Sequence, residues 1–478
     1  MDYWDPIRLP HLHNIQNQVI VDTTTIKGQK VAVLGSQRSA MGAARLLSHF
    51  GAKVLVSESN TDQFTAEKRE LFRKIGAEFE FGYHSQDVME CDFIVVSPGI
   101  PENVEIMQKI REQGIPVYSE IEITSWFIDA PIIAVTGSNG KTTTVNLIHH
   151  LLQTAGYDSY LGGNVGVAAS EVYLDSLSDS PKKPIFVLEV SSFQLDNIEH
   201  FKPQVAVILN LTPDHLDRYP SLDAYYDSKL GLLRNLDENC TAVINQDDPE
   251  LMRRDIVAEN KRVFAVDNLS GGDAMLAEGV LGMMKDTGWC PILPAKALPL
   301  PGRHNLSNAL AAVASVMDFI DQPEVLARGL MTFNAVPHRI EYIGKVNGIR
   351  CYNDSKATNI ASTEVAIHSF SQPLWLILGG KDKGGDFTAL LPLLEDHLQQ
   401  ILLVGDASDI IDTQIGRDVT TSRMDTIDSA IDFALKEGQP GDVLLLSPAC
   451  ASFDQFENYE ARGDHFREQI QDQTGWSM

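Results

Sequence analysis

A strand, a glycine-rich loop and a helix follow one another from residue 131, and this order strongly constrains the fold. The segment reads PIIAVTGSNGKTTTVNLIHHLLQTAG: an apolar run, then GSNGKTTT, then an amphipathic stretch. Glycines let a backbone wrap around a phosphate so that successive N–H groups point at its oxygens, and the helix N-terminus adds favourable partial charge. The residues expected to hold ATP here are Gly137, Asn139, Gly140, Lys141, Thr142 and Thr143.

Two positions of this loop have defined roles in phosphate binding. The Lys141 ammonium reaches the β- and γ-phosphates, and the Thr142 hydroxyl is suited to ligate Mg²⁺. Between Gly137 and Gly140 lie two residues, Ser138 and Asn139, whereas the common phosphate loop has about four residues between its glycines. The shorter form indicates a subset of ATPases.

Apolar runs alternate with helical stretches along the rest of the chain, which is typical of α/β folds with parallel sheets. The 478 residues correspond to about three domains. We therefore expect an α/β protein with a Rossmann-like N-terminal domain, a central P-loop ATPase domain with a parallel sheet, and a Rossmann-like C-terminal domain. The expected domains are residues 1–125, including a leader at 1–28, then 126–336 and 337–478.

The apolar runs are expected to be buried strands. Because ligands of parallel sheets bind at the carboxyl ends of the strands, the residues that end these runs are candidates for a site. Residues 271–295 carry no motif and are expected to form a peripheral strand and loop. The expected strands include residues 30–35, 53–59, 92–99, 116–123, 184–192, 204–215, 373–380, 400–405 and 442–449.

Charge and composition restrict the partners. A net charge of −27 argues against nucleic acid, because neutralising its phosphates needs clustered lysine and arginine. The N-terminus lacks the basic and apolar blocks of a signal peptide, and no apolar run approaches the roughly 20 residues that span a bilayer. Five scattered cysteines without CxxC spacing indicate free thiols in a reducing compartment. We expect a cytoplasmic protein, not inserted in a membrane, whose partners are small molecules.

Two side chains that suit a metal stand where apolar runs end. Glu189 lies at the end of the run in LEVSSFQL, and His215 ends the next run, in LTPDHLDRY. Phosphoryl transfer needs Mg²⁺ ligands near the phosphates, and the carboxyl ends of parallel strands share one edge of a sheet. These positions favour a metal site over a capping carboxylate and a core histidine.

Other candidates stay ambiguous on the residues alone. Lys229, in YYDSKLGLL, has the pattern of an ordinary solvated helix lysine. Arg339 and Lys356 stand near the junction of the second and third expected domains, where they either contact a γ-phosphate or are surface cations. The stretch from Gly35 to Gly42 does not match GxGxxG, so it either binds a dinucleotide or only positions a helix.

Eight sequence blocks occur in one order along the chain: GSNGKTTT, GGNVG, LEVSSFQL, LTPDHLDRY, GRHNLSNALAA, PHRIE, NDSKATN and LLSPACASFDQF. Together they resemble the Mur ligase family, over about residues 30–470. The resemblance implies an ATP-dependent ligase that adds an amino acid to a nucleotide-sugar precursor in peptidoglycan synthesis. Within the family, NDSKATN and SPACASFDQF favour the addition of D-glutamate to UDP-N-acetylmuramoyl-L-alanine.

The resemblance also implies roles at the ATP and metal sites. Glu189 matches a ligand of one Mg²⁺ ion, and His215 matches a ligand of a second. Lys229 matches a lysine that these ligases carbamylate with CO₂, which creates an anionic oxygen ligand. The residues with implied catalytic roles are Lys141, His215, Lys229 and Lys356. Further implied ATP contacts are His304, Asn305 and Asn308 on the adenine and ribose side, and Arg339, Asp354 and Lys356 from the third domain.

Substrate contacts follow from the same resemblance. Asn164, in GGNVG, matches a contact to the muramoyl group. Asn60 stands where the family has an arginine, which is a departure in the first domain. The implied D-glutamate pocket comprises Thr358, Lys383, Ser452 and Phe453, and the UDP moiety is expected at Arg38, Ser39, Ser59 and Gly99.

The implied reaction proceeds through an acyl phosphate made from ATP and the terminal carboxylate of the precursor, with the third domain closing to exclude water. A related amide ligase such as folylpoly-γ-glutamate synthase is the alternative within enzymes, and a folate acceptor separates the two. A nucleotide-binding switch or motor would hydrolyse ATP without an acceptor. A non-catalytic binder is disfavoured by the intact Lys141, Thr142, Glu189 and His215.

Overall fold

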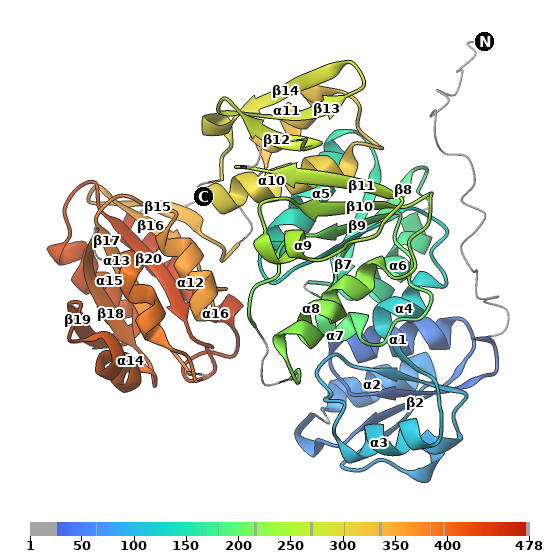
Figure 1. Cartoon of the computed structure of the whole chain (residues 1–478). Helices are drawn as coiled ribbons and strands as arrows, with labels where there is room; N and C mark the ends of the chain where they lie inside the picture. Colours follow the sequence, from blue (N-terminus) through green and yellow to red (C-terminus); the bar gives the residue numbers. More distant parts are fainter. Residues whose placement is uncertain are drawn as a thin grey trace. The chain divides into compact units, whose positions relative to one another are not determined.

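The structure is a computed structural model that describes residues 26–474, except positions 64, 165, 180, 215–217, 268–270, 301, 334–336, 383, 395 and 396 (Figure 1). The chain divides into two compact units. The first unit runs up to Lys141 and includes Ile148–Phe264 and Ala314–Asp321, whereas the second comprises Thr142–Leu147, Ala265–Val313 and the chain from Gln322 onwards. No helix in the described part of the chain is long and apolar enough to cross a membrane.

A five-stranded parallel sheet opens the first unit, in the order β3-β2-β1-β4-β5. Its central strand has the sequence KVAVL, of which all but the first residue are buried, as expected for a strand covered on both faces. Separate apolar cores lie on the two faces, one with α1 and α2 and the other with α3. The elements are β1 (Lys30–Leu34), α1 (Arg38–His49), β2 (Lys53–Glu58), α2 (Ala66–Ile75), β3 (Glu78–Phe81), β4 (Phe93–Val96), α3 (Glu105–Glu112), β5 (Val117–Ser119) and α4 (Glu120–Ser125).

A second set of parallel strands in the first unit has the order β11-β10-β9-β6-β8-β7. Its central strand, IIAVT, is fully buried and leads into the phosphate loop. The elements are β6 (Ile132–Thr136), α5 (Lys141–Thr154), β7 (Asp158–Gly163), α6 (Ala169–Asp179), β8 (Pro184–Glu189), α7 (Ser192–Leu195), β9 (Val205–Ile208), α8 (Leu222–Leu230), β10 (Thr241–Asn245), α9 (Pro249–Arg253) and β11 (Asn260–Ala265).

Buried carboxylates join these two sheets within the first unit. The Glu122 carboxylate of α4 accepts hydrogen bonds from the backbone N–H groups of Glu199, His200 and Phe201 at 2.8–3.0 Å. Glu120 accepts hydrogen bonds from the backbone and hydroxyl of Ser170 on α6. Both carboxylates are almost fully buried, and their hydrogen bonds fix the position of α4, which connects the two sheets.

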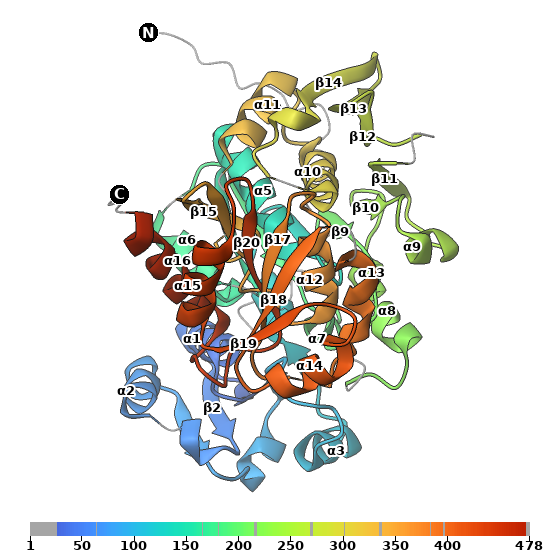
Figure 2. The same ribbon diagram turned by 90° about the vertical axis from the view of Figure 1, so that its left-hand side faces the viewer.

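The second unit contains an antiparallel meander and a six-stranded sheet. The sheet has the order β15-β16-β20-β17-β18-β19, and β15 is its antiparallel edge strand. One face packs against α12, α13 and α14, and the other against α15 and α16 (Figure 2). The elements are β12 (Ala274–Ala277), β13 (Val280–Lys285), β14 (Gly288–Pro294), α10 (Arg303–Val316), α11 (Pro323–Thr332), β15 (Glu341–Val346), β16 (Ile349–Asn353), α12 (Ile360–Ile367), β17 (Leu374–Gly379), α13 (Leu391–Leu394), β18 (Leu398–Val404), α14 (Ser408–Ile415), β19 (Thr421–Asp425), α15 (Ile427–Glu437), β20 (Val443–Ala449) and α16 (Tyr459–Thr474).

The predicted α/β fold with parallel-rich sheets is confirmed, but several expected strands differ, most clearly in three places. The run at 116–123 forms a strand only to Ser119, because the Ser119 hydroxyl caps α4 by accepting from the Glu122 N–H. The run at 204–215 is paired only to Ile208, although Leu209 and Leu211 beyond it are buried. Residues 271–295 form three antiparallel strands rather than one strand and a loop.

Candidate active site

The loop that follows β6 has the backbone of a phosphate cradle. Gly137 has φ +150°, and a Cβ atom there would lie 2.9 Å from the Cβ of Leu209, so a side chain would clash. Gly140 has φ +86° and precedes α5 directly. The first residue of α5 is Lys141, so the N–H groups of the first turn of this helix lie at the loop.

Residues just beyond β9 hold the loop in shape. The side-chain oxygen of Asn210 accepts from the Asn139 N–H at 2.8 Å, and its amide nitrogen donates to the Asn139 carbonyl at 3.0 Å. The Ser138 hydroxyl donates to the Thr212 carbonyl at 2.8 Å. Asn210 and Thr212 are therefore supporting residues that the sequence pattern did not single out.

Two lysines converge on one carbonyl of this loop. The Lys141 Nζ donates to the carbonyl oxygens of Gly137 and Ser138 at 2.7 and 2.8 Å. The Lys229 Nζ, on α8, donates to the same Gly137 carbonyl at 3.0 Å and lies 4.5 Å from the centre of the Tyr225 ring. The structure thus brings Lys229 to the phosphate loop, which its surface-like sequence pattern did not indicate.

The surroundings of Lys229 favour its neutral amine. The residue is 2% exposed. Burial lowers the pKa of Lys229 well below its usual value, and the charge of Lys141 lowers it further, against the opposing effects of Asp214, Asp196 and Glu189. A neutral lysine amine is a nucleophile, whereas a protonated one is not.

Glu189 is the last residue of β8 and is buried, as the sequence predicted. It pairs in register with Val135 of β6, which places it on the strand beside the phosphate loop. The Asn164 amide donates to its Oε1 at 3.1 Å, and the Asn164 N–H donates to its carbonyl at 2.8 Å. Glu189 and Asn164, predicted separately as metal and substrate contacts, are thus direct neighbours.

The expected metal site is only partly within the described residues. His215 lies outside them, so the prediction that it ligates a metal stays a prediction. Among the residues that the structure describes, no group of three His, Cys, Asp or Glu side chains is arranged to hold a metal. The donor set near Lys229 fits Mg²⁺ only in part, because Mg²⁺ prefers oxygen ligands and the amine offers none until it is carbamylated.

Within the second unit, four sequence-predicted residues meet at the first turn of α5. The Lys356 Nζ donates to the Thr142 hydroxyl at 2.8 Å. Arg339 donates to the Thr143 hydroxyl at 3.2 Å. Cations that reach the hydroxyls of a phosphate-loop helix are suited to neutralise phosphate charge there.

The predicted adenine-side residues lie together on α10. Asn308 accepts from the Thr144 hydroxyl at 3.4 Å and donates to the side chain of Asn305 at 3.2 Å. Burial, and then the charge of Arg339, lower the pKa of His304 to about 4. His304 is therefore a neutral hydrogen-bonding group at physiological pH.

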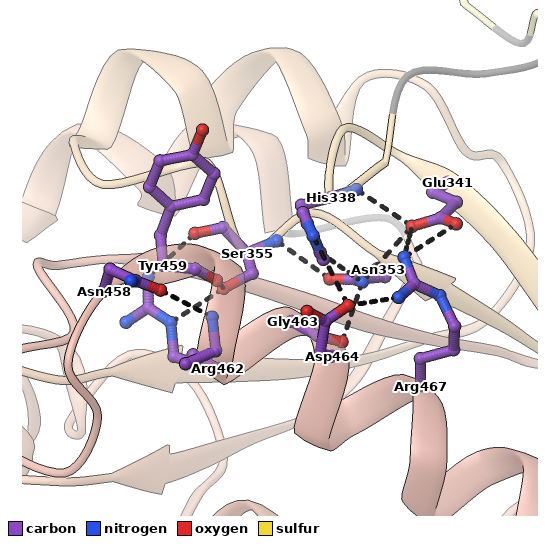
Figure 3. Close-up of polar contacts among 11 residues, drawn as sticks. His338, Glu341, Asn353, Ser355, Asn458, Tyr459, Arg462, Gly463, Asp464 and Arg467 are labelled. Atoms are coloured by element: carbon purple, nitrogen blue, oxygen red, sulfur yellow. Dashed lines mark hydrogen bonds and ion pairs between the residues drawn. The ribbon is translucent and has the colours of Figure 1, made fainter. Parts of the chain in front are cut away.

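A buried network in the second unit fixes the backbone that carries Arg339 (Figure 3). His338 has φ +63° and is buried. The Asn353 amide donates to its Nδ1 at 3.0 Å, and the His338 N–H donates to Glu341 at 2.9 Å. Arg467 holds Glu341 through two hydrogen bonds of 2.8 and 3.0 Å. This network keeps a strained backbone position in place next to Arg339.

Arg462 ties together two loops that carry predicted site residues (Figure 3). Its guanidinium donates to the hydroxyl and carbonyl of Ser355 at 2.9 and 2.8 Å, and to the carbonyls of Cys450 and Ala451 at 3.1–3.3 Å. It is 2% exposed. Ser355 precedes Lys356 and Ala451 precedes Ser452, so Arg462 positions both loops, although sequence reasoning did not select it.

Asp354, also buried, lies at the end of β16. Its carboxylate accepts from the Ser447 hydroxyl at 2.8 Å and from the Ile340 N–H at 3.1 Å. Burial raises the pKa of Asp354 to about 7, against the lowering effects of the Ser447 hydrogen bond and the Arg339 charge. Asp354 thus links the segment of Arg339 to the sheet and is positioned to change protonation near neutral pH.

The predicted amino-acid pocket is described in part. Ser452 is buried, Thr358 is half-buried and Phe453 is 67% exposed. The Thr358 N–H donates to the carbonyl of Lys356 at 2.9 Å, so these two predicted residues share a turn. Lys383 lies outside the described residues.

The four residues predicted to contact UDP do not all line the same cavity. Ser59 and Gly99 line one cavity of about 810 Å³ at the carboxyl ends of β2 and β4. Arg38 donates instead to the Asn164 carbonyl at 3.2 Å, and neither Arg38 nor Ser39 lines that cavity. Asn60, which replaces the expected arginine, donates its N–H to the Glu58 carboxylate at 2.9 Å.

Family models match three successive parts of the chain. They are described as the MurD N-terminal domain, over residues 30–106, the Mur ligase middle domain, over 135–316, and the Mur ligase, glutamate ligase domain, over 338–450. With the relatives below, these matches show that the chain belongs to the Mur ligase family.

Particular relatives carry a more specific name. The proteins named UDP-N-acetylmuramoylalanine--D-glutamate ligase of Salinibacter ruber and Koribacter versatilis are 38% and 37% identical to this chain over 458 and 449 residues. Each match covers 93% of this chain and 98% of the relative. The protein of the same name from Geobacillus kaustophilus is 38% identical, over 92% of this chain and 96% of its own length.

Solved structures agree on the fold alone. A pseudomurein peptide ligase type C from Methanothermus fervidus has a TM-score of 0.57 at 18% identity, over 93% of this chain and 100% of that one. A UDP-N-acetylmuramate-alanine ligase from Thermotoga maritima has the same TM-score and identity, over 93% of this chain and 99% of that one.

Proposed function

We propose that this protein is an ATP-dependent ligase that joins D-glutamate to UDP-N-acetylmuramoyl-L-alanine in peptidoglycan synthesis. The observation that carries the proposal is the convergence of Lys141 and buried Lys229 on the Gly137 carbonyl, beside Glu189. Relatives with this printed name match the chain over nearly its full length, and they support the choice of substrates.

The reaction has two bond-forming steps. A terminal carboxylate oxygen of the precursor attacks the γ-phosphorus of ATP, the bond to the β-phosphate oxygen breaks, and ADP leaves. The amine of D-glutamate then attacks the carbonyl carbon of the acyl phosphate, loses a proton, and expels inorganic phosphate. Activation is needed because a free carboxylate at neutral pH does not react with an amine.

Lys141 and the N-terminus of α5 hold the phosphates of ATP. The ammonium, already directed at the loop carbonyls, turns to the β- and γ-phosphate oxygens, and the backbone N–H groups of the loop donate to them. The Arg339 and Lys356 side chains add charge near the hydroxyls of Thr143 and Thr142. Asp354 anchors the segment of Arg339, and His304, Asn305 and Asn308 bind the adenosine.

Lys229 takes up CO₂ as a carbamate. Its neutral amine attacks the carbon of CO₂ and releases one proton, which converts a neutral nitrogen into an anionic oxygen ligand. With Glu189, His215 and the Thr142 hydroxyl, the carbamate would hold two Mg²⁺ ions. Bound Mg²⁺ supplies positive charge that offsets the charge of the transferring phosphoryl group.

Substrate contacts follow the same assignment. Asn164 contacts the muramoyl group from its place beside Glu189, and Ser59 and Gly99 contact the uridine in their cavity. Arg38 and Ser39 begin α1 and serve the diphosphate. D-glutamate binds to Thr358, Lys383, Ser452 and Phe453. We place the reaction in the cytoplasm, where ATP is available and the free cysteines stay reduced.

Isotope transfer tests the acyl phosphate directly. The precursor is labelled with ¹⁸O in its terminal carboxylate and incubated with ATP, Mg²⁺ and D-glutamate. One labelled oxygen is expected in each released phosphate, because the carboxylate oxygen that attacks phosphorus leaves with it. Unlabelled phosphate would contradict the mechanism and point to simple ATP hydrolysis.

A further inference from the structure

The cavity at the carboxyl ends of β2 and β4 has a histidine in its wall. His84 follows β3 and lines the cavity together with Ser59 and Gly99, two of the four residues predicted to contact UDP. Carboxyl ends of parallel strands are where such sheets bind nucleotides. His84 therefore borders the cavity in which the proposed function places the uridine.

A short chain of hydrogen bonds determines which ring nitrogen of His84 carries the proton. The Ser57 hydroxyl donates to the Glu80 carboxylate at 2.5 Å, and these two residues are register partners of β2 and β3. The His84 Nδ1 lies 2.6 Å from the same hydroxyl oxygen. A hydroxyl has one proton, and Ser57 donates it in the hydrogen bond to Glu80. In the hydrogen bond between Ser57 and His84, the donor must therefore be the Nδ1–H of His84.

This arrangement leaves Nε2 with a free lone pair. Among the residues that the structure describes, Ser57 is the hydrogen-bond partner of His84. Burial lowers the pKa of His84, and the charges of Glu80 and Glu58 only partly offset this effect. The other charged residues that line the cavity are Glu105 and Lys109, which pair with each other on α3. The imidazole is therefore neutral at physiological pH, with one acceptor left over.

Glu58 is another acceptor in the wall. Glu58 accepts from the Ser36 hydroxyl at 3.2 Å with one carboxylate oxygen, and from the Asn60 N–H at 2.9 Å with the other. His84 adds to this wall a ring nitrogen, Nε2, that accepts a hydrogen bond.

We propose that Nε2 of His84 accepts the N3–H of the uracil base, which makes His84 a specificity-determining residue of this ligase. Uracil carries a hydrogen at N3, whereas cytosine has a lone pair there and would face Nε2 acceptor to acceptor. A site with an acceptor for N–H strongly rejects a ligand that lacks this donor, because the acceptor of the site then stays unpaired. This inference rests on the proposed function, which brings a uridine nucleotide to the chain.

Binding of UDP, CDP and N3-methyl-UDP to the full chain, measured by calorimetry, tests the proposal. Wild type is expected to bind UDP about 10- to 100-fold more tightly than either analogue. In His84→Leu this preference collapses to within about threefold, mainly through weaker UDP binding. His149→Leu is the matched control, because His149 also contacts a serine hydroxyl, Ser159, but lies on α5 away from the cavity, and it should keep the preference.

The pH dependence of UDP and CDP binding to the wild-type protein is a second test of the proposal. As pH falls through the pKa of His84, Nε2 gains a proton, so CDP binding strengthens while UDP binding weakens. A His84→Leu protein that keeps the wild-type preference, or a wild-type preference independent of pH, would overturn the role of His84 and leave the proposed function standing. Failure of wild type to bind UDP at all would instead contradict the proposed function, and this inference with it.

Discussion

The Lys229 Nζ lies 3.0 Å from the carbonyl oxygen of Gly137, on the loop that leads to Lys141, the proposed phosphate-binding lysine. The same carbonyl also accepts from Lys141. Two ammonium groups on one acceptor repel each other, and burial makes the repulsion costly. Lys229 is the more buried of the two, and its pKa lies well below the usual value; in the proposed reaction it is the lysine that reacts with CO₂.

Replacing Lys229 tests this chemistry. Lys229→Met removes the amine, so ligase activity should fall by at least about 100-fold, as expected when a metal ligand is lost. In the wild type, ¹³C-labelled bicarbonate should give a carbamate carbon signal in NMR that Lys229→Met lacks. Lys436→Met, which changes an exposed lysine, should keep both the signal and the activity. A carbamate signal that persists in Lys229→Met would place the modification elsewhere.

The Glu189 carboxylate should set the magnesium requirement. Glu189→Gln keeps the shape and an acceptor for Asn164 but removes the negative charge, so the apparent affinity for Mg²⁺ should fall by about 10- to 100-fold. Activity titrated with Mg²⁺ in chelator-buffered solution measures the shift. Glu171→Gln, which changes a carboxylate paired with Arg45, is the control. An unchanged Mg²⁺ midpoint in Glu189→Gln would remove Glu189 from the metal site.

The sequence revealed the phosphate loop because its strand, glycines and helix are contiguous. It could not reveal Arg462, whose partner Ser355 is 107 residues away and is met only when α16 packs against the sheet. It also could not reveal the proton position on His84, which depends on strand pairing between Ser57 and Glu80.

Two errors in the predicted strands have physical reasons. Leu209 and Leu211 are buried without strand pairing, so an apolar run extends further than the strand. The helix that interrupts the run at 116–123 carries a signal that was overlooked: Ser119 and Glu122 form the S-x-x-E pattern of a helix start. The role of Lys229 came only from the family resemblance, because burial of a lysine is a tertiary property.

Asp354 should make stability depend on pH. Its pKa is raised from 3.8 to about 7 in the folded chain, so its contribution to stability is complete below about pH 4 and is lost as pH rises through about 7. Asp354→Asn cannot ionise, and the amide can donate to Ser447, whose hydroxyl already reaches Thr363 at 3.1 Å. Urea unfolding from pH 4 to 8 should therefore show a flatter pH dependence in the variant. An equal slope in both proteins would contradict a raised pKa.

Arg462 should matter for both stability and catalysis. Arg462→Met removes the guanidinium that donates to the carbonyls of Ser355, Cys450 and Ala451, which should cost about 2–4 kcal/mol of unfolding free energy. Arg417→Met, an exposed arginine, should cost less than about 0.5 kcal/mol. Urea midpoints measure both.

Kinetic measurements on Arg462→Lys distinguish a role of Arg462 in positioning the loop of Ser452 from a role in stability alone. At a temperature where Arg462→Lys is fully folded by circular dichroism, its KM for D-glutamate should still rise about tenfold, because the loop of Ser452 is no longer fixed. Normal kinetics in folded Arg462→Lys would show that the residue only stabilises the fold.

The most direct test of the proposed function is phosphate release measured with ATP, Mg²⁺, UDP-N-acetylmuramoyl-L-alanine and one amino acid at a time. Release should require both the precursor and D-glutamate and should produce the D-glutamyl product in equal amount. L-glutamate, or a folate acceptor in place of the precursor, should give at most about one hundredth of that rate. Phosphate release without D-glutamate, or equal release with other amino acids, would contradict the assignment.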